Sequence, residues 1–367
     1  MKKVILMLAV AAMASCSKSD VESRPDLNIK TRSNAVEAVA GTRVYEGQIA
    51  AANTLTAKVL ASKTQGQYGA NLYAEGTMTF NDQTTAVAFD AGATGSTFYP
   101  ANGDKIYLFG LYPSDAAWTV ESDNSSFTCA LDGKTDLMVA KELETSKADA
   151  PSSYKQFVFD HILTRLDVSV VAEDQAAIDA WGEVTGIELT DVASTSTAYV
   201  QPNNNCKVPV TYAGTDVSVP TANRPAYTAT AVSGVTMPFY FYDGNGATVA
   251  DKYTTDLVSA TKTIALPNAA NSESALRAAY SVIAPVTIKT LKAFKLKVTT
   301  TMTDGTVITK DGVTVELVDD PDDSIVNNGN TAGKYYSITL TFKSTEIKAS
   351  ATVNDWVEGV EGTGDVQ

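Results

Sequence analysis

The sequence has very little of the chemistry that metal centres and hydrolytic active sites require. Among 367 residues there is one histidine, His161, and there are three cysteines. Zinc sites built on two or three histidines are therefore excluded, and no C-x-x-C pair replaces them. A G-x-S-x-G elbow, a P-loop and a dinucleotide fingerprint are also missing. We predict no catalytic residue, no metal ligand and no cofactor, we expect no enzyme, and we interpret His161 as a hydrogen-bonded structural residue.

Basic residues are also scarce. The 28 Lys and Arg residues face 42 Asp and Glu residues, which gives a net charge of −14. Phosphate backbones are bound through clustered Lys and Arg, so nucleic acid is excluded as a partner. The acidic run 319–323 (DDPDD) has oxygens that could attract calcium, but it lacks the D-x-D-x-D-G order of a calcium loop. A solvated acidic turn is the favoured interpretation.

Long apolar runs are lacking except at the N-terminus. Residues 4–14 are uncharged and apolar and follow two lysines, as in a secretory signal. The run is too short to cross a bilayer, which takes roughly 20 residues. Small residues directly precede Cys16, a pattern that resembles a bacterial lipobox with Met13 in place of Leu. Residues 1–15 are thus predicted to be a lipoprotein signal peptide and Cys16 to carry lipid; an ordinary cleaved signal is the alternative.

Residues 16–32 are predicted to be a polar tether that ends in a short strand. Leu27 and Ile29 alternate with polar neighbours, which favours a strand. Arg32 follows directly. Arg43 lies further on in similarly weakly patterned sequence, where proteolytic nicking concentrates.

The rest of the chain is too long for one core, so two domains are expected. The small, polar stretch 146–153 is the candidate linker. It divides an N-terminal domain, residues 33–153, from a C-terminal domain, residues 154–367.

Short alternating segments and turn pairs indicate an all-β fold. Asn102 with Gly103 and Asp132 with Gly133 are predicted hairpin turns, because both positions of a type I′ turn need positive φ. Asp304 with Gly305 should join the segments 294–302 and 306–310 in the clearest hairpin. Residues 334–343 alternate cleanly, with apolar side chains predicted to face inward. The prediction is two consecutive β-sandwiches.

Two local features stand out in the second half. In a regular strand Phe157 and Phe159 would point to one face, whereas the apolar residues of 166–170 would point to the other. A bulge or bend is therefore expected near Asp160 and His161. Residues 174–184 form the best helix candidate, with Asp174 as the N-cap and Gly182 as the stop.

Cys129 and Cys206 are the only cysteines after Cys16. A disulfide between them would suit an oxidising compartment. Two separate buried thiols are the alternative.

Several of these segments together resemble a known family. The lipobox cysteine, the strand before Thr31 and Arg32, the central FDHILTRLDVSV (159–170) and the ending YYSITLTF with IKASATVNDWVEG are similar to the fimbrillin family. This family comprises the Mfa-like and FimA-like pilin lipoproteins of Bacteroidetes type V pili. The resemblance implies two transthyretin-like β-sandwich domains, a cell-outer-membrane lipoprotein precursor anchored through Cys16, and a cell-surface fimbrium that supports adhesion.

The resemblance also implies a route of assembly. An Arg-specific protease cuts after Arg32, or alternatively after Arg43, and removes the strand that carries Leu27 and Ile29. The groove that opens is filled by a C-terminal strand from another fimbrillin subunit, since an unpaired edge favours strand addition. The candidate donor residues share one face or follow Trp356: Ile347, Ala349, Ala351, Val353 and Val357.

Two other functions stay open. The chain could be a tip or anchor fimbrillin, and a tip would bind a host protein or glycan while an anchor would keep its lipid. It could also be a monomeric surface lipoprotein that stacks glycans on Trp118, Trp181 or Trp356. Core packing is the favoured interpretation for each Trp.

Overall fold

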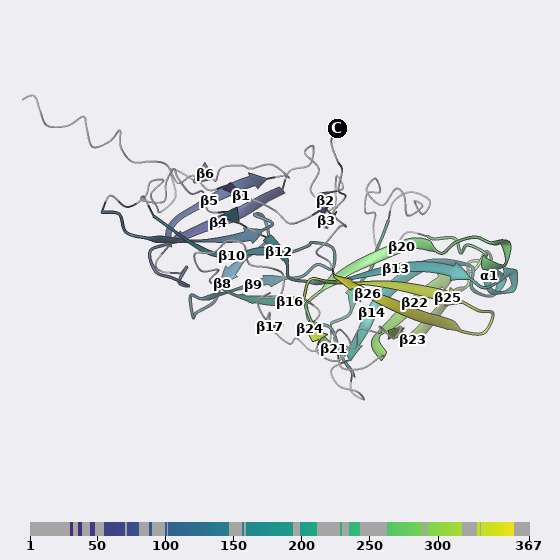
Figure 1. The fold of residues 1–367 in the computed structure, drawn as a ribbon. Helices are drawn as coiled ribbons and strands as arrows, with labels where there is room; N and C mark the ends of the chain where they lie inside the picture. Colours follow the sequence, from purple (N-terminus) through teal and green to yellow (C-terminus); the bar gives the residue numbers. More distant parts are fainter. Residues whose placement is uncertain are drawn as a thin grey trace, which may run out of the picture.

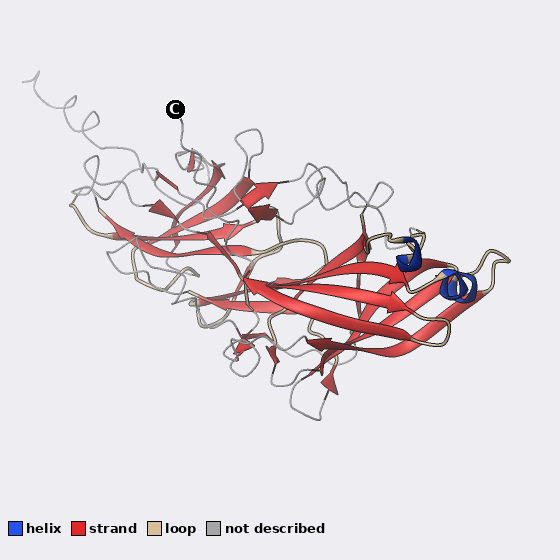
Figure 2. Cartoon of the chain, turned by 45° about the vertical axis from the view of Figure 1, so that its right-hand side comes forward, coloured by secondary structure: helices blue, strands red, loops and turns tan. Residues whose placement is uncertain are grey.

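The fold is known from a computed structural model. It describes residues 55–69, 72–80, 100, 102–146, 159–193, 199–210, 235–242, 263–288, 292–317 and 332–355, and short strands at 30–31, 36–38, 45–47, 88–89, 156–157, 228–229 and 329–330. Strands dominate these residues, and the one α-helix is short (Figure 2). The predicted all-β class with a short helix is confirmed.

The first lobe consists of two sheets. The six-stranded sheet has the order β12 (Phe159–His161), β10 (Met138–Thr145), β7 (Ile106–Tyr112), β4 (Leu55–Ser62), β5 (Leu72–Phe80) and β6 (Ala88–Phe89). The four-stranded sheet has the order β17 (Thr228–Ala229), β16 (Asn205–Pro209), β9 (Ser126–Ala130) and β8 (Thr119–Val120). Side chains of both sheets share one core, in which the rings of Phe109 and Phe127 stack at 5.6 Å. The two sheets therefore pack as a sandwich.

The second lobe is a single ten-stranded sheet (Figure 1). Its order is β15 (Tyr199–Val200), β14 (Glu183–Ala193), β22 (Lys292–Thr301), β23 (Val307–Leu317), β26 (Ile347–Asp355), β25 (Lys334–Phe342), β13 (Thr164–Ala172), β20 (Leu276–Ile283) and β19 (Tyr240–Phe241), with β18 (Met237–Pro238) on β14. Phe294 of β22 meets Tyr336 of β25 edge to face at 5.2 Å, although two strands separate them in the sheet. The sheet therefore curls around its own core.

One short segment joins the two ends of this curled sheet. β18 pairs with β14, and β19, which follows it in the chain, pairs with β20. Between them the backbone NH of Phe239 donates to Ile187 O at 3.0 Å. This segment therefore covers part of the outer edges of β14 and β20, which protects those edges.

The remaining elements are short. They are the paired strands β1 (Lys30–Thr31) with β11 (Gln156–Phe157), β2 (Val36–Ala38) with β3 (Tyr45–Gly47), β21 (Thr287–Ile288) with β24 (Gly329–Asn330), the helix α1 (Gln175–Trp181) and a 3₁₀ turn (Ala269–Asn271). The predicted caps of α1 are confirmed: Asp174 accepts from the NH of Ala177 at 2.9 Å, and Gly182 ends the helix with φ of +73°.

Local sequence patterns explain several strands. Tyr336, Ile338, Leu340 and Phe342 are each at most 2% exposed, as their alternation predicts. The hairpin at Asp304 and Gly305 joins β22 and β23 as expected. The change of phase near His161 has a simple origin: β12 ends at His161 in the first lobe, and β13 begins at Thr164 in the second. The two sets of apolar residues therefore belong to different strands in different sheets.

Two predicted hairpins are wrong. Gly103 and Gly133 do have positive φ, +79° and +81°. However, β9 and β10, on either side of Asp132 and Gly133, belong to different sheets. The strand after Asn102 and Gly103, β7, pairs with β4 and β10 and not with β6 before it. The turn at Asp132 and Gly133 leads from one sheet to the other, whereas β6 and β7 belong to the same sheet without pairing. Positive φ thus permits a tight turn without requiring that its flanking strands pair.

The chain also returns to the first lobe late in the sequence. β16 and β17 come from residues beyond the predicted boundary at 153 and 154, yet β16 pairs with β9. The division into domains at this boundary stays a prediction, and hydrogen bonds of one sheet cross it.

Candidate assembly site

The start of the described chain lies against a strand of the first half. Lys30 and Thr31 of β1 pair in parallel with Gln156 and Phe157 of β11, and the two strands form a sheet of their own. β11 immediately precedes β12, the end strand of the six-stranded sheet. The predicted sites Cys16, Leu27, Ile29, Arg32 and Arg43 lie outside the described residues. β1 is the strand directly before Arg32.

The other predicted assembly element, near the end of the chain, is integrated into the second lobe. β26 pairs with β25 along its whole length and with β23 through Ala349 to Ala351. Ile347, Ala349 and Ala351 are at most 8% exposed and belong to the core. The backbone of Val353 lies opposite Tyr336, and Val357 lies outside the described residues. Freeing β26 would therefore require opening the core of its own lobe.

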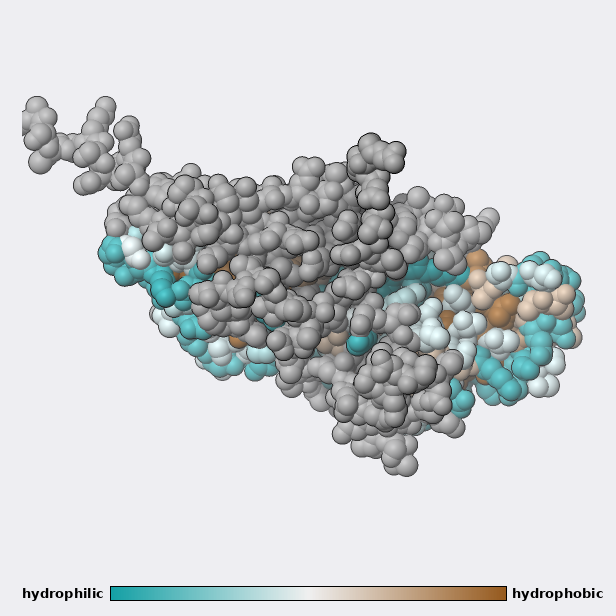
Figure 3. All heavy atoms as spheres, viewed as in Figure 1, coloured by the Kyte–Doolittle hydropathy of each residue, from teal (hydrophilic) through white to brown (hydrophobic). Residues whose placement is uncertain are grey.

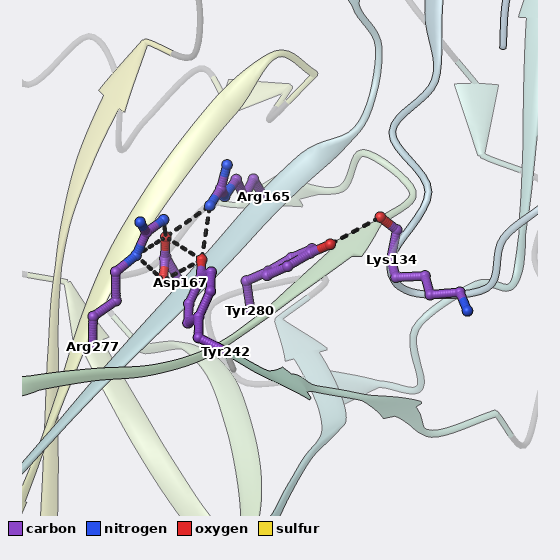
Figure 4. Close-up of polar contacts among 6 residues, drawn as sticks. All are labelled: Lys134, Arg165, Asp167, Tyr242, Arg277 and Tyr280. Atoms are coloured by element: carbon purple, nitrogen blue, oxygen red, sulfur yellow. Dashed lines mark hydrogen bonds and ion pairs between the residues drawn. The ribbon is translucent and has the colours of Figure 1, made fainter. Parts of the chain in front are cut away.

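A buried ion cluster lies where the two lobes meet (Figure 4). Asp167 of β13 is 3% exposed and accepts hydrogen bonds from Arg165 Nη2 at 3.0 Å and from Arg277 Nε at 2.9 Å. Arg277 Nη2 also donates to Asp167. Tyr242 donates to both carboxylate oxygens at 3.2 Å and accepts from Arg165 at 2.9 Å. One carboxylate thus holds two guanidinium groups together, in the strong charge-assisted form.

The electrostatics of this cluster favour the ionised carboxylate. Burial alone would raise the pKa of Asp167, but the positive charges of Arg277 and Arg165 outweigh it and lower that pKa. Arg165 also lies 5.1 Å above the ring of Tyr280, and Arg277 lies 4.5 Å above that of Tyr242. Both tyrosines belong to the core cluster of the first lobe. The cluster therefore joins charges of the second lobe to aromatic rings beside the first.

A turn of the first lobe is held against the second lobe. Asp132 caps the turn by accepting from the backbone NH groups of Lys134 and Thr135 at 2.9 and 2.6 Å. Three backbone carbonyl groups of the turn accept hydrogen bonds from β19 and β20. Asp132 O accepts from the Tyr240 hydroxyl at 2.8 Å, Gly133 O from Val282 N at 2.8 Å and Lys134 O from the Tyr280 hydroxyl at 3.2 Å. This turn therefore serves as a joint between the lobes.

His161 belongs to the same region and has the structural contact that the sequence predicts. Its Nδ1 lies 2.7 Å from Asp136 Oδ2, and the two side chains are 2% and 0% exposed. Burial raises the pKa of Asp136, although the nearby imidazole opposes this shift. A ring so buried cannot meet a substrate from solvent, so this pair ties β12 to the turn before β10.

Two of the three tryptophans have structural partners. Trp181 is 8% exposed and donates its indole NH to Lys343 O at 2.6 Å, and its ring meets Phe342 edge to face. Trp118 donates to Pro113 O at 3.0 Å. Trp356 lies outside the described residues. The indole NH groups of Trp118 and Trp181 are thus bonded within the chain.

Other classes of site find no residues in the described part of the chain. No group of three or more His, Cys, Asp or Glu residues there is arranged to hold a metal ion. The acidic run 319–323 lies outside that part. No helix among the described residues is long and apolar enough to span a bilayer.

The described surface also has few exposed apolar side chains. Its exposed large hydrophobic residues are Val120, Val200 and Val307, which lie on three different strands. Figure 3 shows mainly hydrophilic and neutral residues around small hydrophobic areas on the described part of the face drawn.

The sequence prediction missed the ion cluster. Arg165 and Asp167 lie two positions apart, opposite in phase to the apolar Leu166, Val168 and Val170 of the same strand. A pair of opposite charges on one face of an otherwise apolar strand was a usable signal. Its partners, Arg277 and Tyr242, are too distant in sequence to have been found from any local pattern.

Comparisons with known proteins give a family and several similar folds. A family model described as fimbrillin-like matches residues 42–356. A protein of Bacteroides uniformis assigned to cell adhesion is 15% identical, with 90% of this chain and 98% of that chain covered and a TM-score of 0.45. One of Bacteroides ovatus is 12% identical, with coverages of 92% and 100% and a TM-score of 0.48.

The tip fimbrial protein Mfa3 of Porphyromonas gingivalis is 10% identical, with coverages of 90% and 100% and a TM-score of 0.36. No curated protein matches the sequence. The assignment to a family rests on the family model, which matches more than half of the chain.

Proposed function

Because the chain belongs to the fimbrillin-like family, we propose that it is a structural, non-enzymatic subunit of a cell-surface pilus that polymerises with other fimbrillin subunits by strand exchange. In this proposal the precursor is exported, lipidated at Cys16 and held at the outer membrane. An Arg-specific protease then cuts after Arg32, or after Arg43. Polymerisation supports adhesion, and it needs no cofactor.

The pairing of β1 with β11 is the observation that supports this proposal most. β1 ends one residue before Arg32, and β11 is its only partner in the sheet that the two strands form. A cut after Arg32 separates β1 from the rest of the chain. The backbone groups of Gln156 and Phe157 then lose their partners, beside the end strand β12. An unpaired strand of this kind favours addition of another strand.

The position of β26 supports the choice of another segment as that strand. Ile347, Ala349 and Ala351 are part of the core of the second lobe, so exporting β26 to a neighbour would sacrifice that core. We propose that residues 356–367, which include Val357, form the donor strand. About four to six buried side chains, at roughly 1.5 to 3 kcal/mol each, would stabilise the contact before ordering costs.

Controlled proteolysis tests this proposal. Purified precursor is treated with an Arg-specific protease and run on a denaturing gel without heating. The native chain is expected to give a ladder of oligomers. Arg32→Lys keeps the positive charge but removes the cleavage site, so it is the matched control. With Arg43→Lys added, the ladder should disappear.

Deleting residues 357–367 separates cleavage from assembly. This variant should be cut normally but stay monomeric. If the variant that lacks both arginines still forms full-length polymers, strand removal is not the trigger and the proposal is wrong.

A further inference from the structure

The fold places two distant cysteines directly opposite each other. Cys129 of β9 and Cys206 of β16 are Cα partners in the antiparallel ladder of the four-stranded sheet. Both are in the free thiol form here. They are the only cysteines in the chain apart from Cys16. Their side chains point to the same face of the sheet, because opposite residues of an antiparallel pair share a face.

The hydrogen bonds of the ladder define what kind of pair this is. Leu131 N donates to Asn204 O at 2.8 Å, and Val210 N donates to Ser125 O at 2.8 Å. The register between these bonds is unbroken, so Cys129 and Cys206 also occupy a hydrogen-bonded pair. Cα atoms of such pairs are about 5.5 Å apart. Disulfides span Cα separations of about 4.4–6.8 Å, a range that includes this pair. The bond also needs Cβ atoms about 3.5–4.5 Å apart, closer than in an ordinary hydrogen-bonded pair, so the two strands must draw together locally when it forms.

Both thiols lie in one apolar environment. Cys129 is 3% and Cys206 0% exposed, and both belong to the core that Phe127 and Val208 line from the same two strands. Burial raises the pKa of Cys129 to about 11 and that of Cys206 to about 12. Thiolate is the reactive form. Oxidation therefore belongs to folding, before the core closes around the sulfurs.

We propose that Cys129 and Cys206 form a cross-strand disulfide in the exported protein. This inference rests on the proposed function only for the compartment, since disulfides persist outside the cytosol. Each thiol loses one hydrogen, a sulfur–sulfur bond forms, and two electrons with two protons pass to the disulfide of a thiol–disulfide oxidoreductase. That oxidant is released as a dithiol.

The bond would link β16, with which the chain returns to the first lobe, covalently to β9. Between Cys129 and Cys206 the chain leaves the first lobe after His161 and comes back at Asn205. The disulfide therefore closes a covalent ring that passes through both lobes. A pulling force along the subunit could not strip β16 from β9 while this ring is intact.

Thiol trapping on the full chain tests the proposal. Cells that express the protein are quenched in acid, and the protein is denatured and treated with a maleimide before and after reduction. Peptides with Cys129 and Cys206 are expected to be unlabelled before reduction and both labelled after it. Cys206→Ala should leave Cys129 labelled without reduction. The wild type should melt several degrees lower in reductant, whereas the double Cys129→Ala, Cys206→Ala variant should not respond.

Surface proteolysis of the same intact cells reports export separately. Free Cys129 and Cys206 in surface-exposed protein would overturn the disulfide and leave the pilus proposal standing. Free thiols in protein retained inside the cell would contradict the export that the pilus proposal requires, and the disulfide is then decided by the refolding experiment. Purified protein refolded with oxidised glutathione gives a second readout: if the linked peptide does not form there, the geometric basis of the inference is wrong.

Discussion

The first lobe builds two sheets from residues 55–229, whereas the second lobe builds one curled sheet from residues 164–355. In the second lobe β18 and β19 join the two ends of the sheet, and a buried ion cluster lies beside them. Next to the first lobe, the strand β11 depends on β1, from the beginning of the chain. On this basis we propose a division of labour: the second lobe keeps its own strands, and the first lobe exchanges one.

Breaking the ion cluster should have the largest effect on the second lobe. Asp167→Asn removes the charge that compensates Arg165 and Arg277, and an unpaired buried charge costs about 3–5 kcal/mol. The free energy of unfolding, measured by denaturant titration, should fall by that amount. Glu188→Gln is the matched control, because it breaks the half-exposed Lys297–Glu188 pair at 2.7 Å. Its cost should stay below about 1 kcal/mol. Equal losses would refute the importance of the cluster.

A glycine pair tests how tightly the end of α1 packs against β22. Gly182 has φ of +73° and ψ of −132°, and a Cβ there would collide with the carbonyl oxygen of Thr301. Gly182→Ala should therefore cost about 2–4 kcal/mol in thermal unfolding, from backbone strain plus overpacking. Gly305→Ala has a similar φ of +86° with no described atom within 4 Å, so it should cost only about 1–2 kcal/mol. If the two variants melt together, the close packing at Gly182 is not real.

Acid should reduce the contribution of Asp167. The pKa of this carboxyl is lowered in the folded chain from its ordinary 3.8. Its stabilisation is therefore complete above pH 3.8 and is lost as the pH falls through the folded value. The stability difference between the wild type and Asp167→Asn should be constant near neutral pH and shrink below pH 3.8. A difference that grows in acid would contradict this sign.

The first lobe should show a smaller dependence of opposite sign. Glu142 of β10 accepts from Gly66 N and from Tyr68, both at 2.7 Å. Burial nevertheless raises its pKa above 4.5. The stabilisation from its protonated form is complete below pH 4.5 and is lost as the pH rises through the folded value. Glu142→Gln should change stability by about 1 kcal/mol or less at pH 4, and should gain on the wild type towards pH 7. A stability difference between Glu142→Gln and the wild type that stays constant from pH 4 to pH 7 would contradict the raised pKa of Glu142.

Local patterns could predict much of this fold, because the signals involve neighbours in sequence. The capped helix after Asp174, the hairpin at Asp304 and Gly305, and the alternation from Tyr336 to Phe342 are all local and all confirmed. The pairing of β16 with β9 could not be predicted from local patterns, because the two strands are far apart in sequence and their one shared signal, Cys129 and Cys206, fits two separate buried thiols as well as a bonded pair. Asp132 and Gly133 were misassigned for the same reason: their conformation is local, but the partners of their flanking strands are not.

The candidate site was less predictable than the fold. Pattern alone offered two donor segments, and only tertiary packing distinguishes Ile347, Ala349 and Ala351, which are buried in their own lobe, from the sequence after Trp356. The cluster around Asp167 combines four residues, Arg165, Asp167, Tyr242 and Arg277, from three separate segments. Such a set forms only when the neighbouring strands β13, β20 and β19 have paired.

Amide hydrogen exchange of β11 and β26, followed through assembly, tests the central claim most directly. Exchange is measured by mass spectrometry on the precursor, on the cleaved chain that lacks residues 357–367, and on the native polymer. The account predicts that Gln156 and Phe157 are protected in the precursor, exchange after cleavage, and are protected again in the polymer, while β26 stays protected throughout. Loss of protection in β26, or unchanged protection of β11 after cleavage, would contradict it.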